Sequence, residues 1–461
     1  MKRREFIAAG AAAALAPRSV GWKVRLADRP HPSVPQLEWL RDELAMFLHF
    51  GVNTFTNREW GDGTEDPKIF NPERLDARQW ARAAKTGGFR TLILTAKHHD
   101  GFCLWPTRTT AHSVASSPWR GGKGDVLREL VDACRAESLK VGVYLSPWDR
   151  NASVYGDSAR YNDFYAEQLT ELLTRYGPIA EVWFDGANGE GPNGKKQTYD
   201  WPRVWGTVRQ HQPNAVIFSD AGPDIRWIGN EHGVAGATNW STVDPSVVPF
   251  PGATGSAVMQ MLQQGDPNGA AWRPGETDVS IRPGWFNHAM EDSRVKSVDD
   301  LVGLYFTSVG RNSKLLLNVP PTRDGLLNDV DVARLADLRA RLDSTFSKDL
   351  AAGARTSWKS AGRSAVLDVD LGDTGRFSIA DLREDITQGQ TIARYVLERE
   401  RDGVWQPVCE GTTIGYRKLD RFEPVDARRV RVTIRDAVDT PAEIRISLFA
   451  QLPRDPRPAT A

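Results

Sequence analysis

The 461-residue sequence contains only three cysteines, Cys103, Cys134 and Cys409, and they are widely separated. Three scattered thiols form no disulfide framework and offer no spaced pair for a structural zinc site. An excess of charge of one sign is also missing, since 59 Lys and Arg balance 59 Asp and Glu. Without a basic excess, the chain lacks the electrostatic footprint of a protein that binds nucleic acid or an anionic membrane.

Three signatures of other protein classes are missing as well. The apolar run near the N-terminus is too short to span a membrane. No Gly-x-Gly-x-x-Gly follows the first expected strand, so a nucleotide-binding sheet loses support. No internal repeat or long low-complexity tract occurs.

Tryptophan, by contrast, is abundant, with 16 residues. Indole faces stack on sugar rings, but most Trp residues fill cores, so this abundance alone is weak support for a sugar site.

The N-terminus resembles an export signal. The sequence Met1-Lys-Arg-Arg-Glu-Phe-Ile7 is followed by an Ala-rich run that ends near Ala16. A charged start, a mildly apolar run and small residues are typical of a signal peptide, and Arg-Arg-x-Phe-Ile resembles the twin-arginine type. We therefore expect residues 1–30 to be a signal peptide and linker, and the mature protein to be periplasmic or secreted. The alternative is a basic start on a frayed helix.

Strand-like and helix-like segments alternate from about residue 44. Repeated strand–helix units with buried strands favour a parallel sheet under helices, and about eight strands in roughly 300 residues favour a (β/α)8-like TIM barrel over residues 31–345. Residues 244–280, rich in Gly and Pro, are expected to be a long active-site loop. The expected strands are Leu44–Asn53, Thr91–Thr95, Lys140–Leu145, Glu181–Asp185, Ala215–Ser219, Ala237–Val243, Ser280–Phe286 and Lys314–Val319.

After about residue 346 the pattern changes to short runs in which apolar and polar residues alternate. This period of two, with turn residues between the runs, predicts an antiparallel β-sandwich over residues 346–452. A Pro-rich tail follows at residues 453–461. The clearest runs are 365–371, 392–398, 429–435 and 443–449.

Two carboxylates stand at or just beyond the ends of expected strands. Asp185 ends an apolar run and precedes a glycine, and Glu231 lies in a loop rich in Gly, Asn and Trp. Hydrolysis of a glycosidic bond needs such a pair, because one carboxylate attacks the sugar and the other group protonates the leaving oxygen. The carboxyl ends of barrel strands are the catalytic face. The alternatives are that Asp185 caps the next loop and that Glu231 is a solvated charge.

Other polar and aromatic residues cluster at the same expected strand ends. Glu59 and Trp60 together can hold a sugar, since a carboxylate accepts hydroxyl protons and an indole offers a donor and a flat face. Each candidate taken alone also fits a structural role. The candidates are His49, Glu59, Trp60, His98, His99, Tyr144, Trp183, Arg226 and Trp285.

The adjacent pair His98 and His99 leaves two possibilities open. Neighbouring residues of a strand face opposite ways, so either a bend presents both rings or only one of them acts. Metal binding is a rival interpretation, but the chain has only eight His. A His pair without a nearby third ligand is a weak zinc signal, so recognition of sugar hydroxyls is favoured.

Six segments together resemble glycoside hydrolase family 29, the α-L-fucosidases, over roughly residues 37 to 345. Any one is modest, but six in order along a barrel pattern are specific. The resemblance implies a (β/α)8-like barrel followed by a β-sandwich, as the patterns also predict. The segments are His49-Phe-Gly, Glu59-Trp60, Lys97-His-His-Asp-Gly-Phe102, Val182-Trp-Phe-Asp185-Gly, Arg226-Trp-Ile-Gly-Asn-Glu231 and Ser280-Ile-Arg-Pro-Gly-Trp285.

The resemblance also implies residue roles. Asp185 is the implied nucleophile, and Glu231 is the implied acid/base, at the position used by the branch that prefers α-1,3/1,4 linkages in Lewis-type glycans. The acid/base position varies across the family, so Glu276 and Glu291 are fallbacks. Trp285 is the candidate for the aromatic wall near the sugar's C5 methyl group. The residues that match the fucose surroundings are His49, Glu59, Trp60, His98, His99, Tyr144 and Trp183.

The implied reaction is double displacement with retention, which needs no metal or organic cofactor. Glu231 must start protonated, so burial and the Asp185 anion should raise its pKa, while Arg226, if close, would oppose that rise. The expected partners are fucosylated oligosaccharides or glycoconjugates, and neither nucleic acid nor membrane.

Three alternatives remain open at this point. The chain could be a broad-specificity fucosidase, another retaining glycosidase such as an α-galactosidase, or a carbohydrate-binding protein that no longer catalyses. Fold alone does not choose among them, because barrels host many chemistries. Trp405 and Tyr416 of the sandwich could stack on sugar, although a structural role, docking on the barrel, is favoured.

Overall fold

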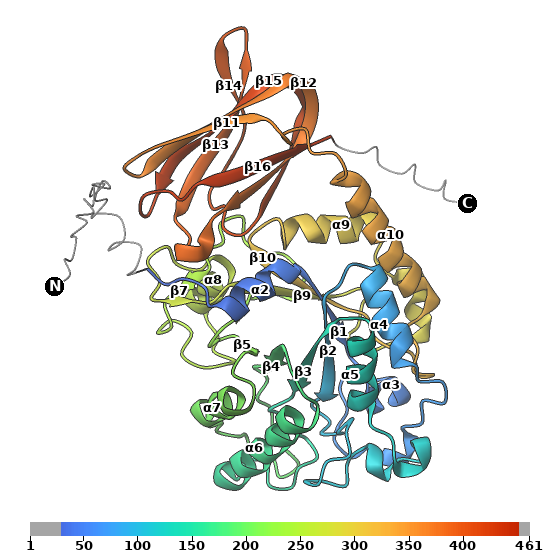
Figure 1. Ribbon diagram of the computed structural model, residues 1–461. Coiled ribbons are helices and arrows are strands. Elements are labelled where there is room, and N and C mark those ends of the chain that lie inside the picture. The colour runs from blue at the N-terminus through green and yellow to red at the C-terminus, as the bar shows by residue number, and fades with distance from the viewer. Residues whose placement is uncertain (1–28, 451–461) are drawn as a thin grey trace, which may run out of the picture.

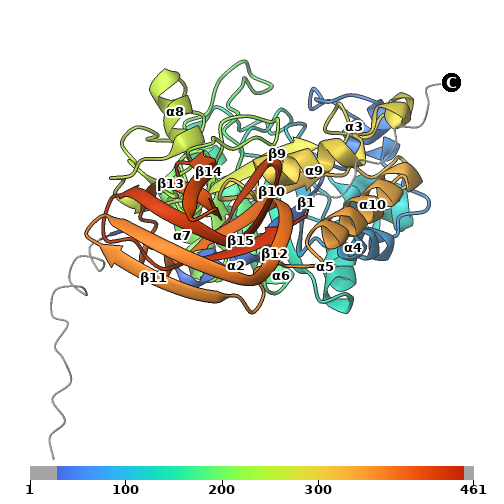
Figure 2. The ribbon, with the colours of Figure 1, turned by 90° about the horizontal axis from the view of Figure 1, so that it is seen from above.

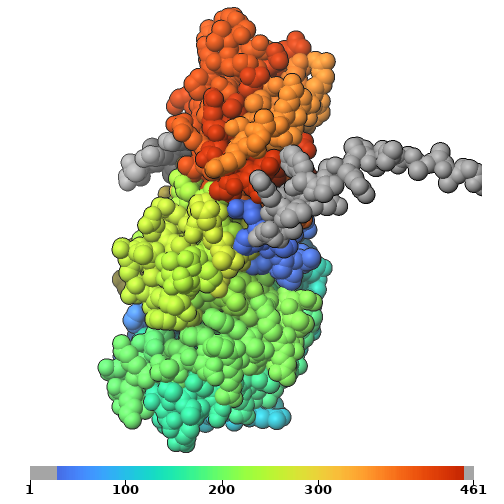
Figure 3. All heavy atoms as spheres, turned by 90° about the vertical axis from the view of Figure 1, so that its left-hand side faces the viewer, coloured from blue at the N-terminus to red at the C-terminus, as the bar shows by residue number. Residues whose placement is uncertain are grey.

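The computed structural model describes residues 29–450. The earlier part of this chain forms a barrel, and the C-terminal strands form a second unit on one side of it (Figures 1 and 3). Nearly all of the predicted signal segment, residues 1–30, lies outside the described residues, as does the predicted tail from residue 453. No helix between residues 29 and 450 is long and apolar enough to cross a membrane.

Eight parallel strands form one sheet in the order β5-β4-β3-β2-β1-β10-β9-β6. Phe218 at the end of β5 bridges in parallel to Ile225 just before β6, so the sheet nearly closes on itself. The predicted (β/α)8-like TIM barrel is therefore confirmed. The strands are β1 (Leu44–Leu48), β2 (Thr91–Lys97), β3 (Lys140–Leu145), β4 (Glu181–Trp183), β5 (Val216–Phe218), β6 (Arg226–Trp227), β9 (Gly275–Ser280) and β10 (Ser313–Asn318).

Helices surround the barrel (Figures 1 and 2). Asp76 caps α4 by accepting from the backbone N–H groups of Arg78 and Gln79, and Asp125 caps α5 by accepting from that of Arg128. Each cap satisfies backbone donors that have no partner within the helix. The helices are α2 (Val34–Asp42), α3 (Val52–Thr56), α4 (Ala77–Thr86), α5 (Val126–Ala136), α6 (Ser158–Arg175), α7 (Trp201–His211), α8 (Ser256–Gln264), α9 (Val298–Thr307) and α10 (Asp329–Thr345). Short 3₁₀ turns are η1 (Pro67–Ile69), η2 (Val114–Ser116), η3 (Trp119–Gly122), η4 (Ala289–Arg294) and η5 (Ile386–Gln388).

Two expected strands were misplaced. The run 237–243 contributes only β7 (Thr242–Val243), which pairs antiparallel with β8 (Ala271–Trp272) outside the barrel. The seventh barrel strand is β9, at residues 275–280, and not the expected run 280–286. Polar residues of β9 are buried inside the protein, so an apolar pattern could not reveal it. The expected loop 244–280 accordingly also contains α8, β8 and β9.

Side chains inside the barrel stack in layers, because alternate residues of a strand face the same side. On β4, Glu181 lies one layer below Trp183, and Asp185 follows above. The apolar interior includes Phe47, Tyr144, Trp183, Phe218 and Leu316, and Trp39 of α2 packs in the same cluster. Trp39 closes the N-terminal end of the barrel, which leaves the opposite end for the pocket.

The C-terminal unit is an antiparallel β-sandwich, as predicted. Its strands pair in the order β11-β12-β15-β13-β14, with β16 on β12, and register shifts interrupt the two long strands β12 and β15. Tyr416 packs with the barrel cluster around Trp39, and Arg431 covers the Trp405 ring, 4.1 Å from its centroid. The strands are β11 (Arg355–Ala361), β12 (Ser364–Glu384), β13 (Ile392–Arg401), β14 (Val404–Gly411), β15 (Lys418–Ala437) and β16 (Ile444–Phe449).

Candidate active site

A pocket of about 620 Å³ opens at the carboxyl ends of the barrel strands. Ten of the predicted site residues line it: His49, Glu59, Trp60, His98, His99, Tyr144, Trp183, Asp185, Glu231 and Trp285. The rest of the wall consists of Phe47, Gly186, Ala187, Asp220, Trp227, Gly252, Ala253, Thr254, Met259 and Asp278. The pocket is therefore acidic and aromatic, and none of its described lining residues is Lys or Arg.

Asp185 follows β4 and is fixed by two donors. The Tyr144 hydroxyl donates to Oδ2 across 3.1 Å, and the backbone N–H of Ala187 donates to Oδ1 across 2.7 Å. His99 Nε2 lies 3.9 Å from Oδ2. The side chain is 27% exposed, so a ligand in the pocket can reach it. A carboxylate held in this way is oriented for attack on an atom in the pocket.

Three buried imidazoles form one side of the pocket. His49 Nδ1 lies 2.9 Å from Asn318 Oδ1, and His99 Nδ1 lies 2.7 Å from Ser146 Oγ. Burial lowers the pKa of His49 to about 3 and that of His98 well below its usual range; burial also lowers the pKa of His99, against the effect of the Asp185 charge. Neutral imidazoles both donate and accept, which suits sugar hydroxyls.

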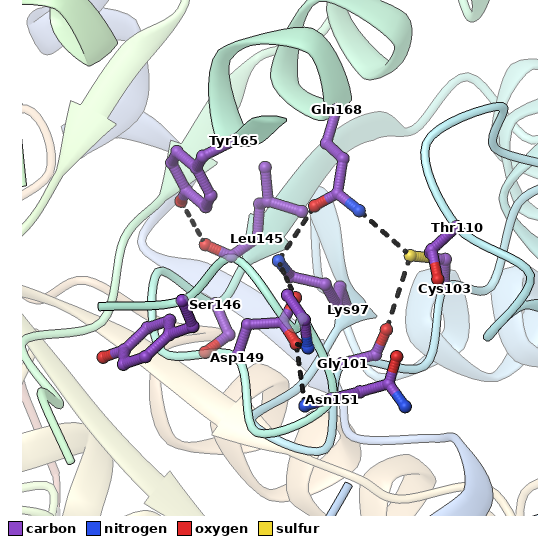
Figure 4. A network of polar contacts seen from close by, with 12 residues as sticks. Lys97, Gly101, Cys103, Thr110, Leu145, Ser146, Asp149, Asn151, Tyr165 and Gln168 are labelled. Atoms are coloured by element: carbon purple, nitrogen blue, oxygen red, sulfur yellow. Dashed lines mark hydrogen bonds and ion pairs between the residues drawn. The ribbon is translucent and has the colours of Figure 1, made fainter. Parts of the chain in front are cut away.

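A bend at the end of β2 presents both His98 and His99 to the pocket. The pairing of β2 with β3 is irregular between Thr95 and Lys97, and His98 follows directly. Lys97 points away from the pocket, where its Nζ donates to Asp149 Oδ2 and to Gln168 Oε1, each across 2.9 Å (Figure 4). This buried ion pair holds the loop after β3 behind the two imidazoles.

Glu231 lies at the rim, in the loop after β6. Its Oε2 accepts from the indole N–H of Trp285 across 3.3 Å. Partial burial raises the pKa of Glu231, and the negative charge of Asp185 raises it further. The Trp285 N–H and His232 act in the opposite direction, but the net shift is upward. A raised pKa favours the protonated form that a general acid needs.

Glu59 anchors the segment that carries Trp285. Its carboxylate accepts from the backbone N–H of Trp285 across 2.7 Å and from that of Phe286 across 3.2 Å. His288 Nε2 lies 2.6 Å from Glu59 Oε1. A carboxylate has about four acceptor positions, so one remains for a ligand. Trp60 beside it is 60% exposed and offers a flat face at the mouth of the pocket.

Comparison with known proteins identifies the chain. The α-L-fucosidase family model matches residues 31–344, which is the barrel. A putative α-L-fucosidase 1 from Oryza sativa subsp. japonica is 45% identical over 433 residues, covering 88% of this chain and 82% of the relative. α-L-Fucosidase 1 from Arabidopsis thaliana is 43% identical over 450 residues, covering 91% and 87%. The chain belongs to the α-L-fucosidase family, glycoside hydrolase family 29.

Solved structures agree with this membership. A putative α-L-fucosidase from Bacteroides ovatus superposes with a TM-score of 0.84 at 45% identity, covering 95% of this chain and 77% of that one. A Ruminococcus gnavus family 29 fucosidase in complex with fucose superposes with a TM-score of 0.82 at 30% identity, covering 92% and 95%. The chain is thus a glycoside hydrolase of the α-L-fucosidase family, and the alternatives of another glycosidase and of a binding protein lose their support.

Two acidic residues of the fucosidase pocket were missed from the sequence. Asp220 follows β5 and accepts from the backbone N–H of Gly252 across 2.9 Å; burial raises its pKa to about 6. Asp278 on β9 accepts from the Trp227 indole across 2.7 Å, and burial followed by the Glu231 charge raises its pKa well above the usual range. The strand-end rule could have found Asp220, whereas Asp278 lay in the stretch taken for a loop.

Arg226, which the sequence placed among the substrate-binding residues, is the one residue of that set that does not line the pocket. Its side chain is buried. Its Nε donates to the Leu262 carbonyl across 2.9 Å, one terminal nitrogen donates to Asn239 Oδ1 across 2.6 Å, and the other bonds the Arg273 carbonyl. On the two-residue strand β6, Arg226 faces the surrounding loops and its neighbour Trp227 faces the pocket.

The two fallback acids lie outside the pocket as well. Glu276 is fully buried inside the barrel and accepts from the Trp183 indole across 3.0 Å. Glu291 lies in η4, with Arg294 3.9 Å away. Among residues 29–450, no group of three or more His, Cys, Asp or Glu side chains is arranged to hold a metal ion.

Proposed function

We propose that this fucosidase removes terminal α-1,3/1,4-linked L-fucose from branched, Lewis-type glycans, with Asp185 as nucleophile and Glu231 as acid/base. One observation carries the proposal: the two carboxyl groups come from loops after different strands and line the same pocket, each with its own donor. The resemblance of the segment Arg226-Trp-Ile-Gly-Asn-Glu231 to the α-1,3/1,4 branch of the family also supports Glu231 as the acid.

The mechanism has two steps, in the retaining manner of family 29. Asp185 attacks the anomeric carbon while Glu231 passes its proton to the glycosidic oxygen, so the aglycone leaves as an alcohol and a fucosyl ester forms on Asp185. Glu231, now a carboxylate, takes a proton from water, and the resulting nucleophile breaks the ester. Fucose leaves with its original configuration, and both carboxyl groups return to their starting states. Retention predicts a separation of about 5–5.5 Å between the two groups.

The rest of the pocket fits this chemistry. The transition state carries positive charge on the sugar ring, and an acidic pocket lined by no Lys or Arg among the described residues favours that charge. The neutral imidazoles of His49, His98 and His99 offer donors and acceptors to the fucose hydroxyls. Trp285 is the proposed wall for the C5 methyl group.

The preference for branched glycans draws support from the side of the pocket where Glu231 stands. The leaving sugar must lie next to the proton donor. There the pocket extends along Trp227, Thr254 and Met259, and Met259 packs beside Gly229, two residues before Glu231. We propose that the leaving sugar and a second sugar beside it lie against this part of the pocket wall.

A comparison of three substrates tests the proposal. Released L-fucose is measured from a Lewis-type trisaccharide, from 2′-fucosyllactose and from an aryl α-L-fucoside. We expect fast release from the branched α-1,3/1,4 substrate and little from the other two. Comparable release from all three would support a broad-specificity fucosidase and undercut the role of Glu231. Proton NMR of the first-formed fucose should show the α-anomer, because retention preserves the configuration.

We also propose export by the twin-arginine route, on the sequence pattern of residues 1–30 alone. The test is cell fractionation of the full chain and of a variant with Arg3 and Arg4 both changed to Lys. The full chain should accumulate outside the cytoplasm and the variant should stay inside. Equal distribution of the two would contradict the proposal.

A further inference from the structure

Three ionisable side chains are buried together inside the barrel, below the sugar pocket. Glu181, Glu276 and Lys314 each have no exposed surface. Lys314 and Glu276 are direct register partners on β10 and β9, and Lys314 Nζ lies 3.5 Å from Glu181 Oε2. Trp39 closes the cluster from below, since its indole donates to Glu181 Oε2 across 2.8 Å.

The charges of this cluster balance only if one carboxyl group is neutral. One ammonium group can compensate one carboxylate, and a second buried anion would be uncompensated at a large cost. Glu181 faces the ammonium group and the Trp39 indole. Glu276 Oε2 and Glu181 Oε1 have no donor, and the two carboxyl groups are hydrogen-bond neighbours. Two carboxyl groups within hydrogen-bonding reach, each with one oxygen that no donor reaches, can share one proton.

The Glu276 side chain is linked to the pocket wall through Trp183. Its Oε1 accepts from the Trp183 indole across 3.0 Å. Trp183 lines the pocket, stacks on Phe218 with centroids 4.1 Å apart, and lies 5.3 Å from the Tyr144 ring. Tyr144 in turn donates to Asp185. A continuous set of contacts therefore runs from the buried carboxyl pair to the nucleophile.

We propose that Glu276 is a positioning residue of the fucosidase reaction: as a neutral carboxyl group it shares a proton with Glu181, accepts the Trp183 indole N–H, and so fixes the pocket floor beside Asp185. Burial and the Glu181 charge raise the pKa of Glu276 well above its usual range, which supports the neutral form. Glu276 does not border the pocket, so it does not exchange a proton with substrate.

The inference rests on the proposed role of Asp185 but not on the linkage preference, so the test substrate is the fucoside that the wild-type enzyme hydrolyses fastest. Failure of the wild-type enzyme on every fucoside would count against the proposed function, and only a difference between variants bears on Glu276. Glu276→Met keeps the length of the side chain and removes the acceptor. Glu276→Gln keeps an acceptor for Trp183 and adds a donor for Glu181.

We expect Glu276→Met to lower kcat/KM at least tenfold, mainly in kcat, and Glu276→Gln to restore it to within threefold of wild type. Glu171→Met is the matched control, because Glu171 accepts from the buried Trp105 indole across 2.8 Å at a site outside the pocket. That control should lose thermal stability and keep its kcat/KM. A folded Glu276→Met enzyme within threefold of wild type would overturn the proposal, as would a Glu276→Gln enzyme as poor as Glu276→Met.

Two further measurements separate positioning from loss of folding. Trp183→Phe removes the donor of the same bond, so the double variant with Glu276→Met should be no slower than the slower single variant. If the loss of kcat/KM in the double variant equalled the product of the two single losses, the proposed bond between Glu276 and Trp183 would be contradicted. Infrared difference spectra test the neutral carboxyl group without Glu276→Met, so they do not depend on whether that variant folds. At neutral pH the wild-type enzyme should show a protonated carboxyl band. This band should disappear in Glu276→Gln and persist in Glu171→Gln. No change of that band in Glu276→Gln would exclude the neutral form.

Discussion

Trp285 donates its indole N–H to Glu231 across 3.3 Å and thereby holds the proposed acid at the rim of the pocket. The bond favours the charged form of Glu231 and opposes the increase in pKa that burial and the Asp185 anion cause. The side chain proposed as a wall for the sugar therefore also adjusts the proton affinity of the proposed acid.

Trp285→Phe should move the basic limb of the pH profile of kcat/KM to higher pH. The variant removes a donor to the carboxylate, so the pKa of Glu231 rises further and the acid form persists to higher pH. The profile is measured on a Lewis-type trisaccharide, whose leaving group needs the acid, beside Trp60→Phe as a pocket control whose ring lies edge-on against His99. A limb that moves to lower pH in Trp285→Phe would show that the indole does not stabilise the carboxylate.

Tyr144→Phe should lower kcat by about 10- to 100-fold, because a hydrogen bond to a charged group contributes about 1.5–3 kcal/mol. Tyr144 is fully buried, so Phe fills nearly the same space, but Asp185 Oδ2 loses its 3.1 Å donor. Tyr165→Phe is the control, since its hydroxyl bonds the Leu145 carbonyl across 2.6 Å outside the pocket. A Tyr144→Phe enzyme with the kcat of the control would remove Tyr144 from the orientation of the nucleophile.

The sequence predicted those parts of the fold whose pattern is apolar. Strands β2 and β10, for example, are buried along their whole length. β9 escaped detection because buried Glu276, Thr277 and Asp278 look like loop residues in the sequence. Their burial depends on partners from other strands, such as Trp183 and Trp227, which no local pattern contains.

The site residues also divide into those that a local sequence pattern could predict and those whose position depends on distant partners. Those at strand ends, such as His49 and Asp185, could be predicted because every parallel strand of a barrel delivers its carboxyl end to one face. Arg226 looked equivalent, but β6 is only two residues long and its position before Trp227 turns it away from the pocket. The direction of a side chain on so short a strand is set by Asn239 and the Leu262 carbonyl, which are distant in sequence.

The two proposed catalytic carboxyl groups should respond differently to removal. Asp185→Ala should abolish turnover of every fucoside, because no covalent intermediate can form. Glu231→Ala should fail on natural glycans and recover on an activated aryl fucoside with azide, which gives α-fucosyl azide because azide attacks the β-linked ester intermediate from the face that water would use. Circular dichroism confirms that both variants fold. Normal turnover by Asp185→Ala would refute its role. An unchanged Glu231→Ala enzyme would make Asp278 the next candidate for the acid, since Asp278 also lines the pocket and has a raised pKa.

In the wild-type enzyme, Asp100 should lower the stability of the fold as pH rises from about 4 to 7. Asp100→Asn should remove this contribution. Asp100 is buried and accepts from the Phe102 N–H across 2.7 Å; burial raises its pKa to about 7, against about 3.9 in an unfolded chain. Between those values the unfolded chain releases the proton and the folded chain keeps it, so rising pH favours unfolding, and the effect is complete above the folded pKa. The Tm of the variant minus that of wild type should therefore increase from pH 5 to pH 7.5.

Asp62→Asn is the control and should give a flat difference in Tm over the same range. The hydroxyl and N–H of Thr64 lower the pKa of Asp62, so its titration ends below this range of pH. A flat difference for Asp100→Asn would mean that Asp100 is already ionised in the folded enzyme at pH 5.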